Sequence, residues 1–304
     1  MIIDLKQRLN QRIELENEFG IEVFIKREDQ IHQHISGNKY RKLKYNLLEA
    51  SQLGFSKLLT FGGAYSNHIA AVAAAGKEFG FSTIGVIRGE ELQDKVALNS
   101  TLLFARSQGM LLKFVSRTSY RKKTESAFIN SLVTEFGDFY LIPEGGTNDL
   151  AIRGCEEILG ETDKEFDYIC CAVGTGGTIS GLINASETHQ KVLGFPVLKG
   201  DFLSNIISKF VRKNNWDLIT DYHFGGYAKV NIELIEFINW FKDQFGVPLD
   251  PVYTGKLMFG VNDLITKGYF KSKSKILVIH TGGLQGIYGM NQQLKQKKLP
   301  QIDV

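Results

Sequence analysis

The chain has 304 residues, a formal net charge of +3 and a charged fraction of 23%. A net charge this small argues against a nucleic-acid-binding face, which needs clustered lysine and arginine. No apolar run approaches the roughly 20 residues of a membrane span, and the start of the chain lacks the apolar core of a secretory signal. The three cysteines show no zinc-binding spacing. We therefore expect a cytoplasmic protein with reduced thiols, no metal site, and no nucleic-acid or membrane partner.

Short apolar segments of strand type alternate with helical segments along the chain. Strands are predicted in 57–63, 82–89, 167–177 and 275–283, and helices in 66–80, 97–109, 178–187, 204–213 and 231–245. Continuous apolar strands that alternate with helices are typical of a parallel sheet covered on both faces. The sequence therefore predicts an α/β protein. Glycines follow several of the strands, at the edge where open α/β sheets bind their ligands.

The first candidate functional residue is Lys39, in "ISGNKYRKL" (35–43). A lysine amine becomes nucleophilic when desolvation or neighbouring cations lower its pKa. Arg41, Lys42 and Lys44 supply such positive charge nearby. Taken alone, a lysine in this setting is better interpreted as an exposed residue. A phosphate site beside it would change that interpretation.

The next candidate is the start of an alanine-rich helix in "FGGAYSNHIAA" (61–71). Ser66 or Asn67 is a natural N-cap, but a cap explains only one of the three polar residues Ser66, Asn67 and His68. The N–H groups of the same turn suit a substrate carboxylate. A loop asparagine also suits a hydrogen bond to a ring hydroxyl.

A glycine-rich turn follows the strand in "AVGTGGTISG" (172–181). The turn consists of Gly174, Thr175, Gly176, Gly177 and Thr178. Its N–H groups and the following helix N-terminus form a cup for phosphate. A dinucleotide fingerprint would need glycine in place of Ile179, and a Walker loop would need a lysine. The turn therefore suits a terminal phosphate monoester, with a ligand-free glycine turn as the alternative.

The last candidate is "VIHTGG" (278–283), in which a buried-type strand ends at Thr281 and two glycines. By itself this segment fits an ordinary turn equally well. A phosphate cup, a carboxylate site and an imine-forming lysine together suggest pyridoxal 5′-phosphate. That cofactor acts as the electron sink while the protein positions it.

Seven segments in order, "KREDQ", "SGNKYRKL", "GGAYSNH", "IPEGGTN", "GTGGTISG", "DPVYTGK" and "HTGG", resemble the fold-type II pyridoxal-phosphate enzymes. The sequence is most similar to the 1-aminocyclopropane-1-carboxylate (ACC) deaminase and D-cysteine desulfhydrase family, over nearly the whole chain. The resemblance implies a tryptophan synthase β-like fold of two three-layer α/β domains with mostly parallel sheets. Residues 1–49 plus 148–304 would form the larger domain and 50–147 the smaller inserted one. The cofactor would lie between them in a homodimer.

The resemblance also implies the residues that bind the cofactor. Lys39 would be the Schiff-base lysine, and Lys42 would support the phosphate together with the backbone of 174–178. Asn67 would contact the ring hydroxyl. Thr281 would face the pyridine nitrogen, and a hydroxyl there leaves this nitrogen largely unprotonated, which favours elimination.

On the substrate side, the resemblance implies that Ser66 and the N–H groups of Asn67 and His68 hold the carboxylate. Tyr227 would line the substrate pocket, and Tyr288 corresponds to a tyrosine that takes part in the deaminase chemistry. Tyr288 lies closer to the preceding glycines than in the deaminases. The Ser-Asn-His sequence and Thr281 are more similar to the desulfhydrases than to the deaminases. The chain is also shortened between about 184 and 222.

The expected function is the breakdown of a small amino acid to a keto acid and ammonia. Elimination of the D-cysteine desulfhydrase type is the main hypothesis, and Lys39 would remove the α-proton. ACC deamination is the alternative, with β-replacement or racemisation behind it. Two other classes stay open: a non-catalytic pyridoxal-phosphate or ligand-binding homologue, and a nucleotide-binding oxidoreductase, against which Ile179 argues.

Overall fold

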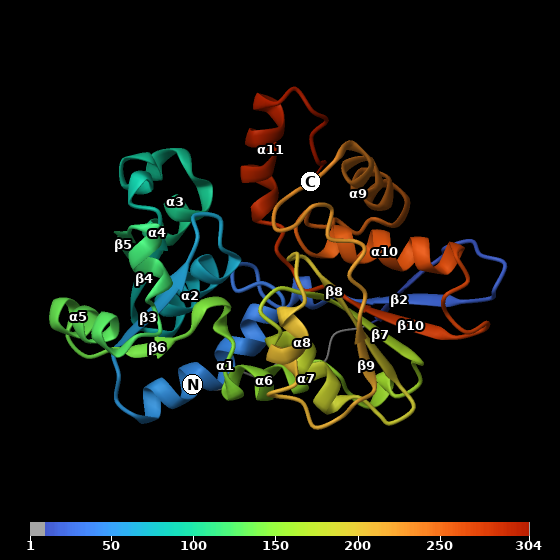
Figure 1. Ribbon diagram of the computed structural model, residues 1–304, viewed down its shortest axis with the longest axis horizontal. Helices are drawn as coiled ribbons and strands as arrows, with labels where there is room; N and C mark the ends of the chain where they lie inside the picture. The colour runs from blue at the N-terminus through green and yellow to red at the C-terminus, as the bar shows by residue number, and fades with distance from the viewer. Residues whose placement is uncertain (1–9, 304) are drawn as a thin grey trace.

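The computed structural model describes residues 10–303, in which the strands form two separate sheets (Figure 1). The larger sheet has the order β1-β2-β10-β7-β8-β9, and β1 is the strand that runs antiparallel to its neighbour. Its strands are β1 (Asn10–Ile13), β2 (Glu22–Lys26), β10 (Lys275–Ile279), β7 (Tyr168–Val173), β8 (Lys191–Pro196) and β9 (Trp216–Leu218). The smaller sheet, β5-β4-β3-β6, is parallel throughout. Its strands are β5 (Leu111–Val115), β4 (Ser82–Arg88), β3 (Lys57–Gly62) and β6 (Tyr140–Ile142).

Helices cover both faces of the larger sheet, as Figure 1 shows, with α9 and α10 on one side and α6 and α7 on the other. Because side chains alternate along a strand, Cys170 packs with Leu234 and Leu257 beneath α9 and α10. Its neighbour Cys171 packs with Leu182 of α7 on the opposite face. Burial on both faces explains the uninterrupted apolar run of β7. The predicted α/β class with mostly parallel sheets is confirmed.

The helices include segments at or near each of the five predicted helical ranges. Their bounds are η1 (Glu28–Gln30), α1 (Asn38–Gln52), α2 (Asn67–Phe79), η2 (Glu90–Leu98), α3 (Ser100–Ser107), α4 (Arg117–Arg121), α5 (Ser126–Phe136), η3 (Glu144–Gly146), α6 (Asp149–Glu156), η4 (Glu161–Asp163), α7 (Gly177–Ala185), α8 (Phe202–Ile207), α9 (Ile232–Phe245), α10 (Thr254–Thr266) and α11 (Gly286–Gln296). No helix within residues 10–303 is long and apolar enough to cross a membrane.

The helix predicted over 204–213 ends early, at Ile207. Asn184 of α7 donates to the carbonyl of Phe210 and accepts from the N–H of Arg212, and this draws the chain away from the helix toward β9. The smaller sheet is built within 57–142, inside the segment predicted as an insertion. The exact domain boundaries, 1–49 plus 148–304 and 50–147, remain a prediction.

Candidate active site

The first turn of α1 brings Lys39 to the end of β10. Gly37, just before the helix, has a φ of 62°, and a Cβ there would lie 1.9 Å from the carbonyl oxygen of Thr281. Only glycine allows this approach. The N–H of Asn38 then donates to the same carbonyl at 3.3 Å. The predicted lysine and the predicted ring-nitrogen partner are thus adjacent, although they are more than 240 positions apart in the sequence.

Lys39 and Lys42 share one face of α1 because they are three residues apart. The Nζ of Lys39 donates to the carbonyl of Gly145 at 3.2 Å, and the Nζ of Lys42 donates to the same oxygen at 3.1 Å. No carboxylate within residues 10–303 forms an ion pair with either amine. Burial, and then the charge of Lys42, hold the pKa of Lys39 well below 10.5. Burial also lowers the pKa of Lys42. A lysine with a lowered pKa supplies the neutral amine that nucleophilic and base chemistry needs.

The glycine turn lies directly beside Lys42. A Cβ at Gly177 would meet the hydroxyl of Thr147 at 2.7 Å and the Nζ of Lys42 at 3.1 Å. Lys42 donates to that same hydroxyl at 3.2 Å. Gly176, with a φ of 87°, is the N-cap residue of α7, whose first N–H groups have no partner within the helix.

These residues fit the phosphate of pyridoxal 5′-phosphate. Lys42 supplies positive charge with no counter-ion, and the helix N-terminus supplies N–H donors. The missing side chain at Gly177 leaves room next to both. Two further residues of the turn hold its shape, since Thr178 accepts from Asn38 at 2.7 Å and Thr175 contacts Thr147 at 2.7 Å.

Ser66, Asn67 and His68 open α2 on the opposite wall. Ser66 is the N-cap, and its hydroxyl accepts from the N–H of Ile69 at 3.3 Å. The side-chain oxygen of Asn67 accepts from Gln285 at 3.0 Å, so Asn67 reaches the turn that follows Thr281. The N–H groups of Asn67 and His68 lie in the first helical turn, where they have no partner within the helix. They are therefore free for a carboxylate.

The His68 ring points into the fold. It is 2% exposed, and its Nε2 lies 2.8 Å from the hydroxyl of Thr60. Burial, followed by the charges of Lys39 and Lys42, holds its pKa well below 6.5, so the ring is neutral. Any contribution of His68 to carboxylate binding therefore comes from its backbone N–H, not from its imidazole.

Two of the tyrosines, Tyr227 and Tyr253, lie against each other, and Tyr288 lies on α11. Tyr227 is 45% exposed, and its ring centroid lies 6.2 Å from that of Tyr253. Lys256 donates to the carbonyl of Gly226 at 2.8 Å and so fixes the loop that carries Tyr227. Tyr288 is 61% exposed on α11, and its hydroxyl has no hydrogen-bond partner in residues 10–303. The role predicted for Tyr288 remains a prediction.

Tyr253 is a residue that the sequence analysis did not single out. A Cβ at Gly174 would lie 3.2 Å from its ring, so the ring sits against the glycine turn. Burial, and then Tyr227, raise its pKa well above 10, so the phenol keeps its proton. The sequence feature that could have indicated Tyr253 is the "DPVYTGK" segment. In it, the buried Asp250 accepts from the N–H groups of Tyr253 and Thr254 at the start of α10.

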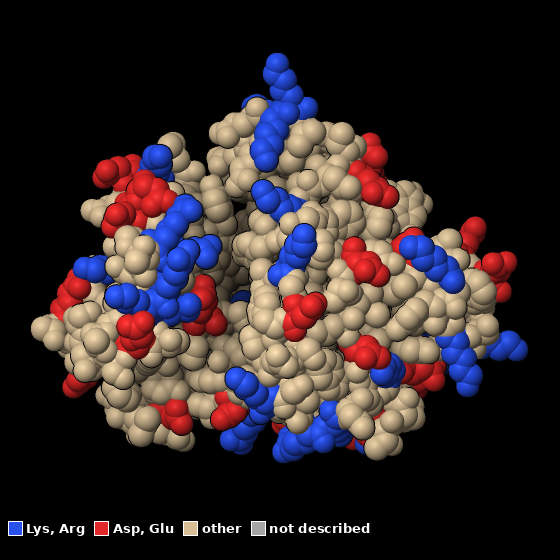
Figure 2. Space-filling model, viewed as in Figure 1, with Lys and Arg blue, Asp and Glu red and all other residues tan. Residues whose placement is uncertain are grey.

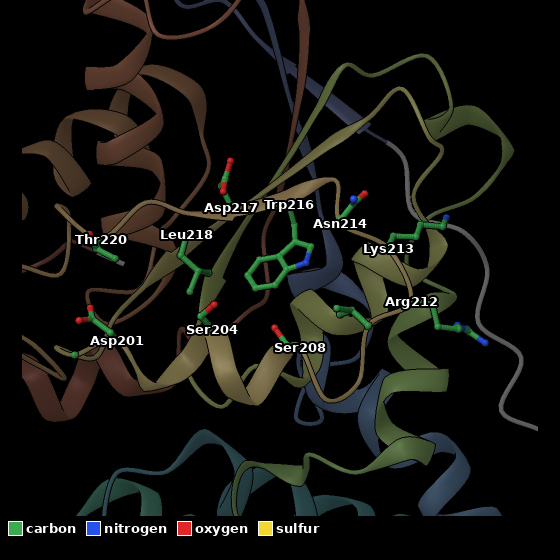
Figure 3. A pocket seen from close by; sticks show the side chains of 12 residues that line it. Asp201, Ser204, Ser208, Arg212, Lys213, Asn214, Trp216, Asp217, Leu218 and Thr220 are labelled. Carbon is green, nitrogen blue, oxygen red and sulfur yellow. The ribbon is translucent and has the colours of Figure 1, made fainter.

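Of two surface cavities, one lies away from the predicted site residues and one lies next to them. One of about 840 Å³ lies between α8 and β9, with the indole of Trp216 facing Ser204 and Ser208 (Figure 3). None of the predicted site residues lines it. A second cavity of about 570 Å³ is lined by Gly63, Ala64, Tyr65 and Glu144, which immediately precede Ser66 and Gly145 in the chain. It opens where the space-filling view shows a hollow between the two halves of the molecule (Figure 2).

A family model described as "Pyridoxal-phosphate dependent enzyme" matches residues 7–282, and the chain belongs to this family. An Arabidopsis thaliana protein named "Bifunctional D-cysteine desulfhydrase/1-aminocyclopropane-1-carboxylate deaminase, mitochondrial" is 33% identical over 90% of this chain and 75% of its own. A D-cysteine desulfhydrase of Klebsiella pneumoniae is 27% identical over 92% of both chains. The crystal structure of an "ACC deaminase homologue" superposes with a TM-score of 0.82, at 30% identity over 96% of this chain and 94% of that one.

These likenesses confirm three predictions: the family resemblance, the fold-type II architecture and the pyridoxal-phosphate cofactor. The chain is a pyridoxal-phosphate-dependent enzyme. The roles of the individual site residues remain predictions.

Proposed function

We propose that the enzyme breaks down a small amino acid to a keto acid and ammonia, with D-cysteine-type β-elimination as its main reaction. The main support is that the amines of Lys39 and Lys42, neither of which has a carboxylate partner, lie beside the glycine turn. The names of the Klebsiella and Arabidopsis relatives support the choice of D-cysteine.

In this proposal the cofactor is held by residues of both halves. Lys42 and the turn of Gly174, Thr175, Gly176, Gly177 and Thr178 hold the phosphate. Asn67 contacts the ring hydroxyl, Thr281 faces the ring nitrogen, and Lys39 is the attachment point. When bound, pyridoxal phosphate stabilises the negative charge that develops on the α-carbon of an amino acid.

The side chains of this enzyme supply the remaining steps. The N–H groups after Ser66 orient the substrate carboxylate at the start of α2. The amine of Lys39 takes the α-proton, because burial and the charge of Lys42 lower its pKa and so favour the neutral form of the amine. The protonated phenol of Tyr253, with Tyr227 next to it, donates a hydrogen bond to the departing thiolate. The sulfur leaves with the electrons of its bond to the β-carbon.

ACC deamination is the second candidate. ACC has no α-proton, so its ring must open by attack or protonation at a ring carbon. The Tyr227–Tyr253 pair offers hydroxyl groups for this step, and the Arabidopsis relative is named for both activities. Tyr288, whose ring is 61% exposed, remains a predicted participant in this step.

The test is a panel of D- and L-amino acids plus ACC, in which release of keto acid and ammonia is measured with the holoenzyme. We expect D-cysteine to give the highest kcat/KM. A higher value for ACC would replace the main proposal with the second one. No release from any amino acid would identify a ligand-binding homologue that does not turn over.

We further propose that the enzyme is a cytoplasmic homodimer. The support for the compartment is that Cys155, Cys170 and Cys171 are all buried and unpaired, as reduced thiols are. The support for the dimer is that α9 exposes Ile232 and Trp240, at 47% and 42%. Light scattering at micromolar concentration measures the mass directly, and a monomer would contradict the proposal.

A further inference from the structure

The cavity beside the substrate turn is strongly basic. Its four cationic side chains project from the end of β4 and from α4 and the turn after it: Arg88, Arg117, Arg121 and Lys123. One carboxylate, Glu144, lines the cavity with them. Figure 2 shows a band of basic side chains on this half of the molecule, along the edge of the hollow. The lining therefore carries an excess of three positive charges.

The acids nearby neutralise only part of this charge. Glu144 accepts from the hydroxyl of Tyr120 at 2.7 Å and pairs with Lys123 at 3.2 Å. Arg117 pairs with Glu91, outside the cavity lining, at 2.8 Å. In residues 10–303 no carboxylate forms an ion pair with Arg88 or Arg121. Arg88 lies over the ring of Tyr120, at 5.8 Å from its centroid. Two guanidinium groups thus face the cavity without a counter-ion.

The cavity is lined by residues next to those of the candidate active site. Glu144 immediately precedes Gly145, whose carbonyl accepts from Lys39. The Nη2 of Arg88 lies 3.7 Å from the Cβ position of Gly63, three residues before Ser66. Across the cleft, Arg88 lowers and Glu144 raises the pKa of the Tyr227 hydroxyl, although burial is the largest cause of its raised pKa. The charges of Arg88 and Glu144 therefore influence the Tyr227 hydroxyl.

We propose that this cavity receives an anionic group on the β-carbon of the substrate, a sulfonate or a phosphate ester, which then leaves. Guanidinium groups suit such oxyanions because they offer paired N–H donors in a fixed fork. The inference rests on the proposed β-elimination and names a substrate class for it. Lys39 takes the α-proton, and the bond from the β-carbon to sulfur or oxygen breaks with its electron pair on the departing sulfite or phosphate. Water then releases ammonia and the keto acid, so no oxidant is needed.

The experiment compares four substrates with the holoenzyme, each as both enantiomers: O-phosphoserine, cysteate, the uncharged ester O-acetylserine, and cysteine. We expect O-phosphoserine to exceed O-acetylserine in kcat/KM. In the double variant Arg88→Gln/Arg121→Gln, the ratio of these two values should fall about 10- to 100-fold, because charge-assisted hydrogen bonds are lost. Arg106→Gln, an exposed arginine of α3 that does not line the cavity, is the matched control and should leave the ratio unchanged.

Each outcome separates this inference from the proposed function. Turnover of D-cysteine with no preference for the anionic substrates overturns the inference and leaves the proposed function standing. Turnover of O-phosphoserine or cysteate without D-cysteine supports the inference and removes the choice of D-cysteine. If nothing is turned over, calorimetric binding decides. Binding of O-phosphoserine but not serine, lost in the double variant, supports the cavity assignment. Arginine-dependent binding of inorganic phosphate alone overturns it in favour of a free-anion site.

Discussion

Two buried lysine sites of this enzyme are built in opposite ways. Lys26, at the end of β2, is fully buried, and its Nζ lies 2.9 Å from Asp163, which is 1% exposed. Asp163 also accepts from Asn10 and from the N–H of Gly160, both at 2.8 Å. Around Lys39 and Lys42, by contrast, the acceptors are one backbone carbonyl and one hydroxyl.

The contrast identifies which lysines are structural. Burying a charge without a partner is costly, so folds normally pair such charges. This chain does so at Lys26 and again at Arg41, which donates twice to the buried Glu28 at 2.8 Å. Leaving two amines unpaired one helical turn apart is therefore consistent with a role in which an external anion and a reactive aldehyde supply the missing partners.

The largest expected effect that tests the comparison is loss of turnover in Lys39→Ala. Removing both the attachment point and the base should reduce the rate of ammonia release about 10³-fold or more. Lys44→Ala is the control, because Lys44 lies on the same helix but pairs with Glu157 at 2.6 Å. Borohydride reduction followed by peptide mass mapping should locate the cofactor on Lys39. Label on another lysine would refute the assignment.

The second test breaks the paired site instead. Asp163→Asn leaves the Lys26 ammonium buried without its counter-charge, and should lower the free energy of unfolding by about 3–5 kcal/mol. Urea denaturation of the apoprotein measures this loss. A cost below about 1 kcal/mol would show that Lys26 does not depend on its partner and would remove the contrast between the sites.

The third test concerns Lys42. Lys42→Met removes the unpaired charge beside Gly177 and should weaken pyridoxal-phosphate binding about 10- to 100-fold, because a charge-assisted hydrogen bond is lost. Fluorescence titration of the apoprotein with the cofactor gives the Kd. Unlike Asp163→Asn, this change should not lower the stability of the apoprotein. An unchanged Kd would exclude Lys42 from the phosphate site.

The smallest effect is a pH dependence of apoprotein stability. Lys39 has a pKa well below 10.5 when folded and the ordinary value when unfolded, so between these values the unfolded chain binds more protons. Its contribution to the free energy of unfolding therefore rises with pH across this window and is least favourable below it.

Lys39→Met should accordingly stabilise the apoprotein at neutral pH, and its advantage should shrink as the pH approaches 10.5. Urea midpoints measured over this range test the sign. Lys77→Met, an exposed lysine of α2, serves as the control and should show no such trend. An advantage for Lys39→Met that grows with pH would contradict a lowered pKa.

The sequence predicted four of the ten described strands, and it did not predict the interior strands β2 and β8 or several edge strands. Apolar runs ending in glycine correctly indicated β3, β4, β7 and β10. The short edge strands β1 and β9 carry polar residues such as Arg12 and Asp217, so they lack that signal. A strand with neighbours on one side only is under weaker selection for apolar residues.

For the candidate site, the sequence could indicate the chemistry of Lys39 but not its surroundings. Its hydrogen-bond acceptor, Gly145, lies 106 positions away, and its contribution is a backbone carbonyl with no side-chain signature. Tyr253 was within a segment already singled out, yet its contact with Gly174 depends on how α10 packs against β7. The basic cavity likewise arises only when β4 and α4 bring Arg88 and Arg121 together.

The strand order of the larger sheet has a consequence for biosynthesis. β10 follows the other nine described strands in the chain, yet it occupies an interior position between β2 and β7. A ribosome-bound chain that already displays Lys39 still lacks the Thr281 carbonyl against which Gly37 packs. Since domains form as their sequence emerges, the cofactor site is complete only after β10 and Thr281 have been made. Translation products that end before β10 would thus lack a complete site for pyridoxal phosphate.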